Sequence, residues 1–201
     1  MQVMDKKCQC DISNSLQQNL SICQTCNRAR NDNLNKGFVP PDHILDNIWI
    51  GGVSSSIDKE ELLKLGINKV MIIMEECCLE LFEDFEYSTI PISTEGDIAP
   101  HLHSMADFIN GGKSGVLIFD NGGSKRSGAG VAAYMIKYKD YLVEEACEYI
   151  DKQRNCVFFP MDYREKLNNF YNSLKAVEQN SKPERHKGKK NSEEVDTSKG
   201  N

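Results

Sequence analysis

Long hydrophobic runs are missing from this 201-residue chain. No stretch approaches the roughly 18–20 consecutive apolar residues that a membrane-spanning helix needs. The first residues, Met1 to Lys7, also lack the apolar centre of a secretory signal. These absences predict an intracellular protein, cytoplasmic or nuclear, without a membrane partner. In that compartment the eight cysteines should be reduced thiols or metal ligands, not disulfides.

An excess of positive charge is missing as well. The formal net charge is −6, so nothing in the overall composition favours a nucleic-acid partner. Residues 177–201 are polar with almost no apolar groups, which predicts a disordered tail. The basic cluster Arg185–Lys190 within it is best interpreted as solvated, and a nuclear-import or phosphate-binding patch is the alternative.

Residues 1–36 have too few apolar side chains to form a core of their own, but they contain two close pairs of cysteines. The four residues are Cys8, Cys10, Cys23 and Cys26. Two such pairs separated by about a dozen residues predict a tetrahedral structural zinc site, whose metal would supply folding energy. The alternative is four free thiols in a disordered leader. No organic cofactor is expected.

Short apolar runs alternate with helical periodicity between residues 48 and 176, which predicts one α/β domain. Residues 37–47, with Pro40 and Pro41, are expected to form an extended linker before it. The expected strands are 48–50, 69–74, 85–92 and 116–119, and the expected helices are 57–65, 101–110, 127–138, 142–153 and 160–176. A helix between two strands implies a parallel crossover unit.

The stretch Val116–Phe119 is a fully apolar run typical of a buried strand, and a polar loop with two glycines follows it. A helix should begin near Ser127, which is a suitable cap. A strand, a glycine loop and a helix N-terminus together form a cradle for anions, because loop N–H groups converge and the helix dipole adds positive potential. Arg126 could grip an oxyanion with its planar guanidinium.

This loop resembles the phosphate-binding loop of the cysteine-dependent dual-specificity phosphatases, H-C-x-x-G-x-x-R-[S/T]. The corresponding residues are Phe119, Asp120, Asn121, Gly122, Gly123, Ser124, Lys125, Arg126 and Ser127. Glycine, arginine and serine match in register, whereas the family's nucleophilic cysteine falls at Asp120 and its histidine at Phe119. The resemblance extends over about residues 44–175 and implies a central, mostly parallel sheet flanked by helices.

The resemblance also implies where a general acid would lie. In the family an aspartate follows an isoleucine–proline pair by one or two residues, and Ile90-Pro91 is similar to that pair. The position falls near Thr94 or Glu95, so Glu95 is the general-acid candidate. The alternative is a solvated turn and helix cap, with Asp97 opening the next helix.

The altered loop predicts a catalytically inactive member, a pseudophosphatase. Asp120 places a negative charge where the loop favours one, so it should attract Arg126 and repel phosphate. Two unit charges about 4 Å apart interact by on the order of 4 kcal/mol at an effective dielectric constant of about 20. The predicted function is protein binding or scaffolding in phosphorylation signalling. Two alternatives remain: a phosphoprotein-binding module that uses Gly123, Ser124 and Arg126, and a residual protein phosphatase with Asp120 as nucleophile.

Overall fold

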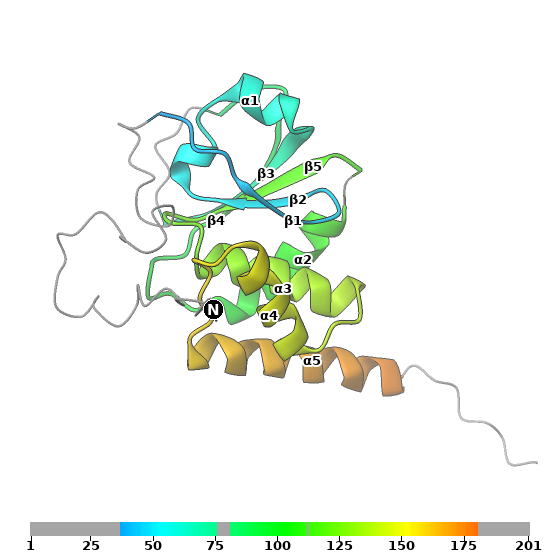
Figure 1. The fold of residues 1–201 in the computed structure, drawn as a ribbon. Coiled ribbons are helices and arrows are strands. Elements are labelled where there is room, and N and C mark those ends of the chain that lie inside the picture. Colours follow the sequence, from blue (N-terminus) through cyan, green and yellow to red (C-terminus); the bar gives the residue numbers. More distant parts are fainter. Residues whose placement is uncertain (1–36, 76–80, 112, 181–201) are drawn as a thin grey trace, which may run out of the picture.

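A five-stranded sheet forms the centre of the molecule (Figure 1). The computed structural model describes residues 37–75, 81–111 and 113–180. The strands are β1 (Asp42–Leu45), β2 (Ile48–Gly51), β3 (Ile67–Ile73), β4 (Glu86–Ile90) and β5 (Gly115–Phe119), in the order β1-β2-β5-β3-β4. Only β1 pairs antiparallel among these strands, which confirms the prediction of a mostly parallel sheet.

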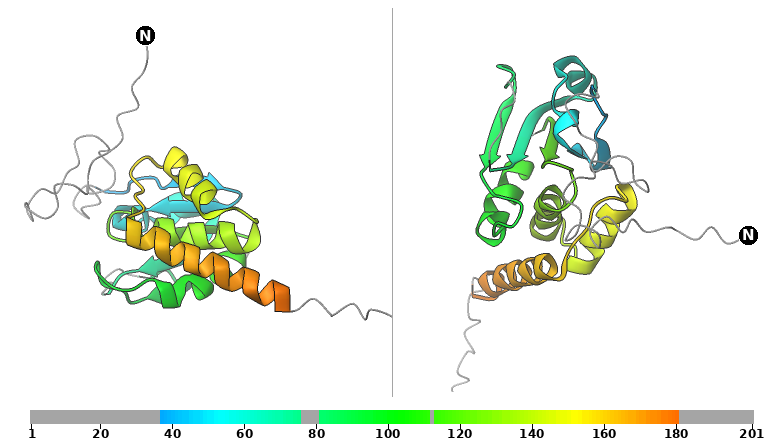
Figure 2. Two further views of the ribbon diagram at one scale, coloured as in Figure 1. Left: turned by 90° about the horizontal axis from the view of Figure 1, so that it is seen from below. Right: turned by 90° about the vertical axis from the view of Figure 1, so that its left-hand side faces the viewer.

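Helices cover both faces of this sheet unequally. They are α1 (Lys59–Lys64), α2 (Leu102–Asn110), α3 (Arg126–Tyr138), α4 (Val143–Gln153) and α5 (Met161–Asn180). The single helix α1 lies on one side, and α2 to α5 lie on the other (Figure 1). Helix α3 is buried between the sheet and the other helices, while α5 runs along the outside of the helical layer (Figure 2).

Strand β5 is the central strand and is buried along its whole length. Val116 and Ile118 belong to the large core beneath α2 to α5. Leu117 and Phe119 belong to the smaller core on the α1 side. This alternation follows from the two-residue period of a strand, and burial on both faces explains why β5 reads as a continuous apolar run. The strand therefore delivers the loop after Phe119 to the middle of the molecule.

The predicted linker 37–47 is wrong for residues 42–45, which form the edge strand β1. These residues pair with β2, an interaction between chain segments that composition does not reveal. The predicted disordered tail is likewise wrong for residues 177–180, which continue helix α5. No glycine or proline interrupts the helix there, and Lys175 pairs with Glu178 one turn on, at 3.1 Å.

The expected helix 57–65 begins two residues later than predicted, at Lys59. Asp58 accepts a hydrogen bond from the N–H of Glu61 at 3.1 Å and so begins α1 at Lys59. The serines before it lie in a short 3-10 turn, Val53–Ser55, and just after it.

The four cysteines of the predicted zinc site and the basic cluster 185–190 lie outside the described residues. Within the described ranges, no three His, Cys, Asp or Glu side chains are grouped so that they could hold a metal ion. None of the described helices combines the length and the apolar character needed to cross a membrane.

Candidate phosphate-loop site

Asp120 is the first residue of the loop between β5 and α3, and it is only 3% exposed. Its Oδ1 accepts hydrogen bonds from the N–H groups of Gly122 (3.0 Å), Gly123 (2.7 Å) and Ser124 (3.3 Å). Its Oδ2 accepts from the N–H of Ser127 at 2.9 Å and from the hydroxyl of the same residue at 3.0 Å. Three donors of the loop and two of Ser127, in the first turn of α3, are thus turned towards the chain's own carboxylate.

The residue before Asp120 contributes packing. Phe119 is fully buried and belongs to the core on the α1 side of the sheet. No ring nitrogen or other polar group is therefore available at this position. The predicted cap Ser127 also has a different role, because α3 begins at Arg126 and the Ser127 hydroxyl donates to Asp120.

Arg126 does not form the expected ion pair with Asp120. It is 5% exposed, and its Nη1 donates to the main-chain oxygen of Ile92 at 2.7 Å. Within the described ranges, no carboxylate lies within ion-pairing distance of its guanidinium. Arg126 therefore ties the loop to the segment that follows β4, and its charge is not neutralised by direct pairing.

Arg154 holds the outer side of the loop. It is 3% exposed, and its guanidinium donates from Nε to the main-chain oxygen of Gly123 (2.8 Å) and from Nη2 to that of Gly122 (3.1 Å). Its Nη1 lies 2.6 Å from Oδ2 of Asp42 in β1. These bonds fix the loop carbonyls outward while the N–H groups point inward to Asp120.

The remaining loop residues surround this arrangement. The Ser124 hydroxyl donates to the main-chain oxygen of Cys156 at 2.7 Å, so it is already engaged. Asn121 is exposed at the rim, and Lys125 is half-buried just before α3. Gly122 is half-buried, and only its N–H and carbonyl take part in the network.

Tyr163 lies in the electrostatic surroundings of the loop. It is 5% exposed, and its hydroxyl has no hydrogen-bond partner in the part of the chain that the structure describes. Burial raises the pKa of Tyr163 to about 12, the charge of Arg126 lowers this pKa and the charge of Asp120 raises it. The charges of Arg126 and Asp120 thus act on the buried hydroxyl in opposite directions.

Glu95 is exposed on the turn after β4. Its carboxylate is a minor influence on Tyr163. Asp97 starts the next helical turn, because its Oδ1 accepts from the N–H of Ala99 at 3.1 Å. That hydrogen bond is the main cause that lowers the pKa of Asp97, and Lys166 at 3.4 Å contributes. Asp97 thus lies just before the 3-10 helix Ala99–His101, whose N-cap is Ile98 without a side-chain hydrogen bond.

The sequence patterns do not identify two buried residues of the site, Arg154 and Tyr163. Arg154 follows the end of a helical pattern, and Tyr163 lies in the first turn of another, so neither has a spacing that signals a site. Only the burial of a charged and a phenolic group beside the loop reveals them. The sequence did indicate the loop itself, through its glycines and its place between a strand and a helix.

Gly123 cannot carry a side chain without distortion. Its φ is +62°, and an added Cβ would lie 2.3 Å from the main-chain oxygen of Gly51 and 2.8 Å from Nη2 of Arg154. We expect Gly123→Ala to lower the free energy of unfolding by about 3 kcal/mol, from backbone strain plus overlap. Urea denaturation measures this loss.

Gly66→Ala is the matched control, because Gly66 has a φ of +73° and open space where its Cβ would lie. It should cost only about 1–2 kcal/mol, the left-handed backbone penalty. Equal losses in the two variants would contradict the close packing of the loop against β2.

A family model for the dual specificity phosphatase catalytic domain matches residues 48–173. Rat dual specificity protein phosphatase 5 is 30% identical over 124 residues, which are 58% of this chain and 32% of that protein. The MAP kinase phosphatase with leucine-rich repeats protein 3 of Dictyostelium discoideum is 27% identical over 119 residues, 57% of this chain and 14% of that protein. The matched region is thus a third or less of each of these relatives.

Solved structures show the same fold. Human DUSP28 has a TM-score of 0.63 at 15% identity, covering 69% of this chain and 99% of that one. The human tyrosine phosphatase-like serine/threonine/tyrosine-interacting protein has a TM-score of 0.61 at 22% identity, covering 69% and 97%. The family match includes β2 to β5, the loop and most of α5, so the chain belongs to the dual specificity phosphatase catalytic domain family.

Proposed function

We propose that this domain is a non-catalytic member of its family, which binds or scaffolds protein partners in phosphorylation signalling. The observation that carries the proposal is the Asp120 carboxylate, which accepts five hydrogen bonds from its own loop and the first turn of α3. A phosphate needs the same kind of inward-pointing N–H groups. Asp120 occupies these donors and adds a negative charge, so it acts as an internal substitute for the ligand.

The side chains that would carry out catalysis in an active family member are replaced here. By the resemblance, Asp120 and Phe119 stand where the nucleophilic cysteine and its neighbouring histidine would be. A carboxylate can attack phosphorus, but here both oxygens accept hydrogen bonds from the loop. Attack would also require the phosphate to enter against the charge of Asp120. The exposed Glu95 offers a proton donor only on a surface turn.

We expect no turnover of p-nitrophenyl phosphate above the buffer rate, with or without Mg²⁺. Asp120→Cys alone should restore little activity, because Phe119 remains and the family's aspartate general acid has only Glu95 as its candidate replacement. Steady-state absorbance measures both. The proposal fails if the unchanged protein turns over the ester and Asp120→Asn abolishes that turnover, since Asp120 would then be a nucleophile.

A phosphoprotein-binding module is the second candidate, and Arg126 favours it. Its buried guanidinium has a single carbonyl partner, and the nearby Tyr163 hydroxyl has none among the described residues. The N–H groups of Gly123 and Ser124, by contrast, are already used by Asp120. Calorimetry with a phosphotyrosine peptide separates the candidates, because micromolar binding that Arg126→Ala removes would favour this module over a self-filled loop.

The N-terminal zinc site also stays a proposal, as does a cytoplasmic or nuclear location. Metal analysis of the purified full-length chain tests the zinc site directly. About one zinc per chain, lost in a variant with Cys23 and Cys26 changed to serine, is the expected result. Metal-free protein would leave these cysteines as free thiols.

A further inference from the structure

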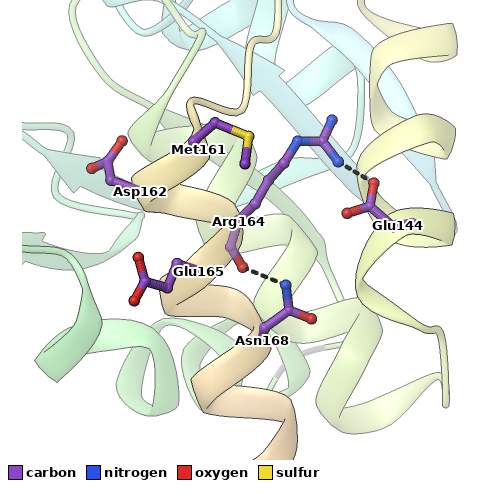
Figure 3. A pocket seen from close by; sticks show the side chains of 6 residues that line it. All are labelled: Glu144, Met161, Asp162, Arg164, Glu165 and Asn168. Atoms are coloured by element: carbon purple, nitrogen blue, oxygen red, sulfur yellow. Dashed lines mark hydrogen bonds and ion pairs between the residues drawn. The ribbon is translucent and has the colours of Figure 1, made fainter.

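A surface groove lies between the beginning of α4 and the first half of α5 (Figure 3). Its volume is about 770 Å³, and its lining residues are Glu144, Met161, Asp162, Arg164, Glu165 and Asn168. A smaller pocket of about 160 Å³ shares Glu144 and Arg164 with it and extends along α4 to the segment before α5. Together the two form one groove, separate from the Asp120 loop.

The groove is strongly acidic. Its five carboxylates are Glu144, Glu148, Asp151, Asp162 and Glu165. Among the described residues, Arg164 is the one cation that lines it. Arg164 is paired with Glu144, and Lys166 beside it is 3.2 Å from Asp162. Glu148 and Glu165 have no ion-pair partner in the described ranges. Among the described side chains that line the groove, carboxylates therefore outnumber cations.

Apolar side chains stand beside these charges. Met161 is 82% exposed and Phe158 is 40% exposed, and both line the groove. Large apolar side chains exposed next to a pocket are typical of an interaction site. The groove thus suits an extended cationic segment whose aliphatic stems can lie on Met161 and Phe158.

The chain itself contains a cationic segment of this kind, after helix α5. Residues 182–190 contain five lysine or arginine residues and one glutamate. Helix α5 ends at Asn180, about 22 Å from Glu165 at roughly 1.5 Å per helical residue. Ten extended residues span up to about 33 Å and seven span about 23 Å, so the residues from Lys187 to Lys190 can reach back to the groove. The tether also holds it at an effective concentration on the order of millimolar.

We propose that the acidic groove binds the lysine-rich end, residues 187–190, of the cationic segment of the same chain. Attraction between these charges is weak for each pair and depends on salt, so the contact forms and breaks readily. A partner with a similar cationic and apolar segment would compete with the tail for the groove. This inference does not depend on the state of the Asp120 loop.

Carbodiimide cross-linking of the full-length protein, followed by mass spectrometry, tests this proposal. Lysines 187, 189 and 190 should form links to groove carboxylates within one chain, and 0.5 M NaCl should reduce them. A variant with Glu148→Gln, Asp162→Asn and Glu165→Gln should show at least a fivefold loss of links to the remaining carboxylates, Glu144 and Asp151.

The matched control neutralises three exposed carboxylates on the α1 side of the sheet: Glu60, Glu83 and Asp84. It should leave the links unchanged. Links spread over both sides of the molecule, or links unaffected by the groove variant, would overturn the proposal. Links between isotopically heavy and light copies would overturn it as well, because they would show a second copy as the occupant.

Discussion

Asp120→Ser should bind inorganic phosphate or tungstate about a thousandfold more tightly than the unchanged chain. Removing a unit charge about 4 Å from a phosphate charge gains on the order of 4 kcal/mol at an effective dielectric constant of about 20, which is about three decades in affinity. The substitution also frees the N–H groups of Gly122, Gly123 and Ser124 for a ligand. Isothermal titration calorimetry measures the difference.

Thermal unfolding gives a second readout of the same change. Without phosphate, Asp120→Ser leaves buried donors unsatisfied, at about 1–3 kcal/mol for each lost partner, so its Tm should fall. Phosphate should then raise this Tm, since a ligand that binds only the folded state stabilises it. The Tm of the unchanged chain should not respond, because Asp120 already fills the loop.

Two variants control this experiment. Asp84→Ser removes an exposed carboxylate that lies outside the Asp120 loop and pairs with Lys59. This variant should not bind phosphate. Arg126→Ala in the Asp120→Ser background should remove the gained affinity, because the guanidinium would hold the phosphate. If phosphate raised the Tm of the unchanged chain as much as that of Asp120→Ser, the internal carboxylate would not be what blocks the loop.

The sequence predicted the parts of this site that are set by residues close to one another along the chain. A buried strand, a glycine loop and a helix are local patterns, so the boundaries of β5 and α3 were expected to within a residue or two. The place of Asp120 at the base of the loop follows directly from that order. What Asp120 contacts is also local, since all five donors lie within the next seven residues.

The partners of the arginines could not be predicted in this way. Arg126 donates to a carbonyl 34 residues earlier, at Ile92, and this depends on the path of the chain after β4. Arg126 and Asp120 are close in sequence, so an ion pair between them was expected. Instead, donors close to Asp120 along the chain form hydrogen bonds with both oxygens of its carboxylate. The edge strand β1 was missed because its pairing with β2 is not visible in its composition, and the ion-pair partner of its Asp42 lies 112 residues later.

Substitution of that partner, Arg154, should reduce the stability of the fold more than any other substitution that we propose. Arg154→Ala should lower the free energy of unfolding by about 3–5 kcal/mol, as is typical when one member of a buried ion pair is removed. The side chains of Arg154 and Asp42 are only 3% and 16% exposed, so Asp42 would keep a largely buried charge without this partner. The carbonyls of Gly122 and Gly123 would also lose their donors. Urea denaturation measures the loss.

Arg164→Ala is the comparison that separates this effect from the general cost of losing an arginine. Arg164 pairs with Glu144 at the surface, where the side chains are 28% and 63% exposed, so its loss should cost about 1 kcal/mol or less. Arg154→Lys should recover only part of the stability, because one ammonium cannot reach two carbonyls and a carboxylate in the geometry of the guanidinium. Amide hydrogen exchange at Gly122 and Gly123 should be faster in Arg154→Ala. If Arg154→Ala cost no more than Arg164→Ala, the loop would hold its shape through Asp120 alone.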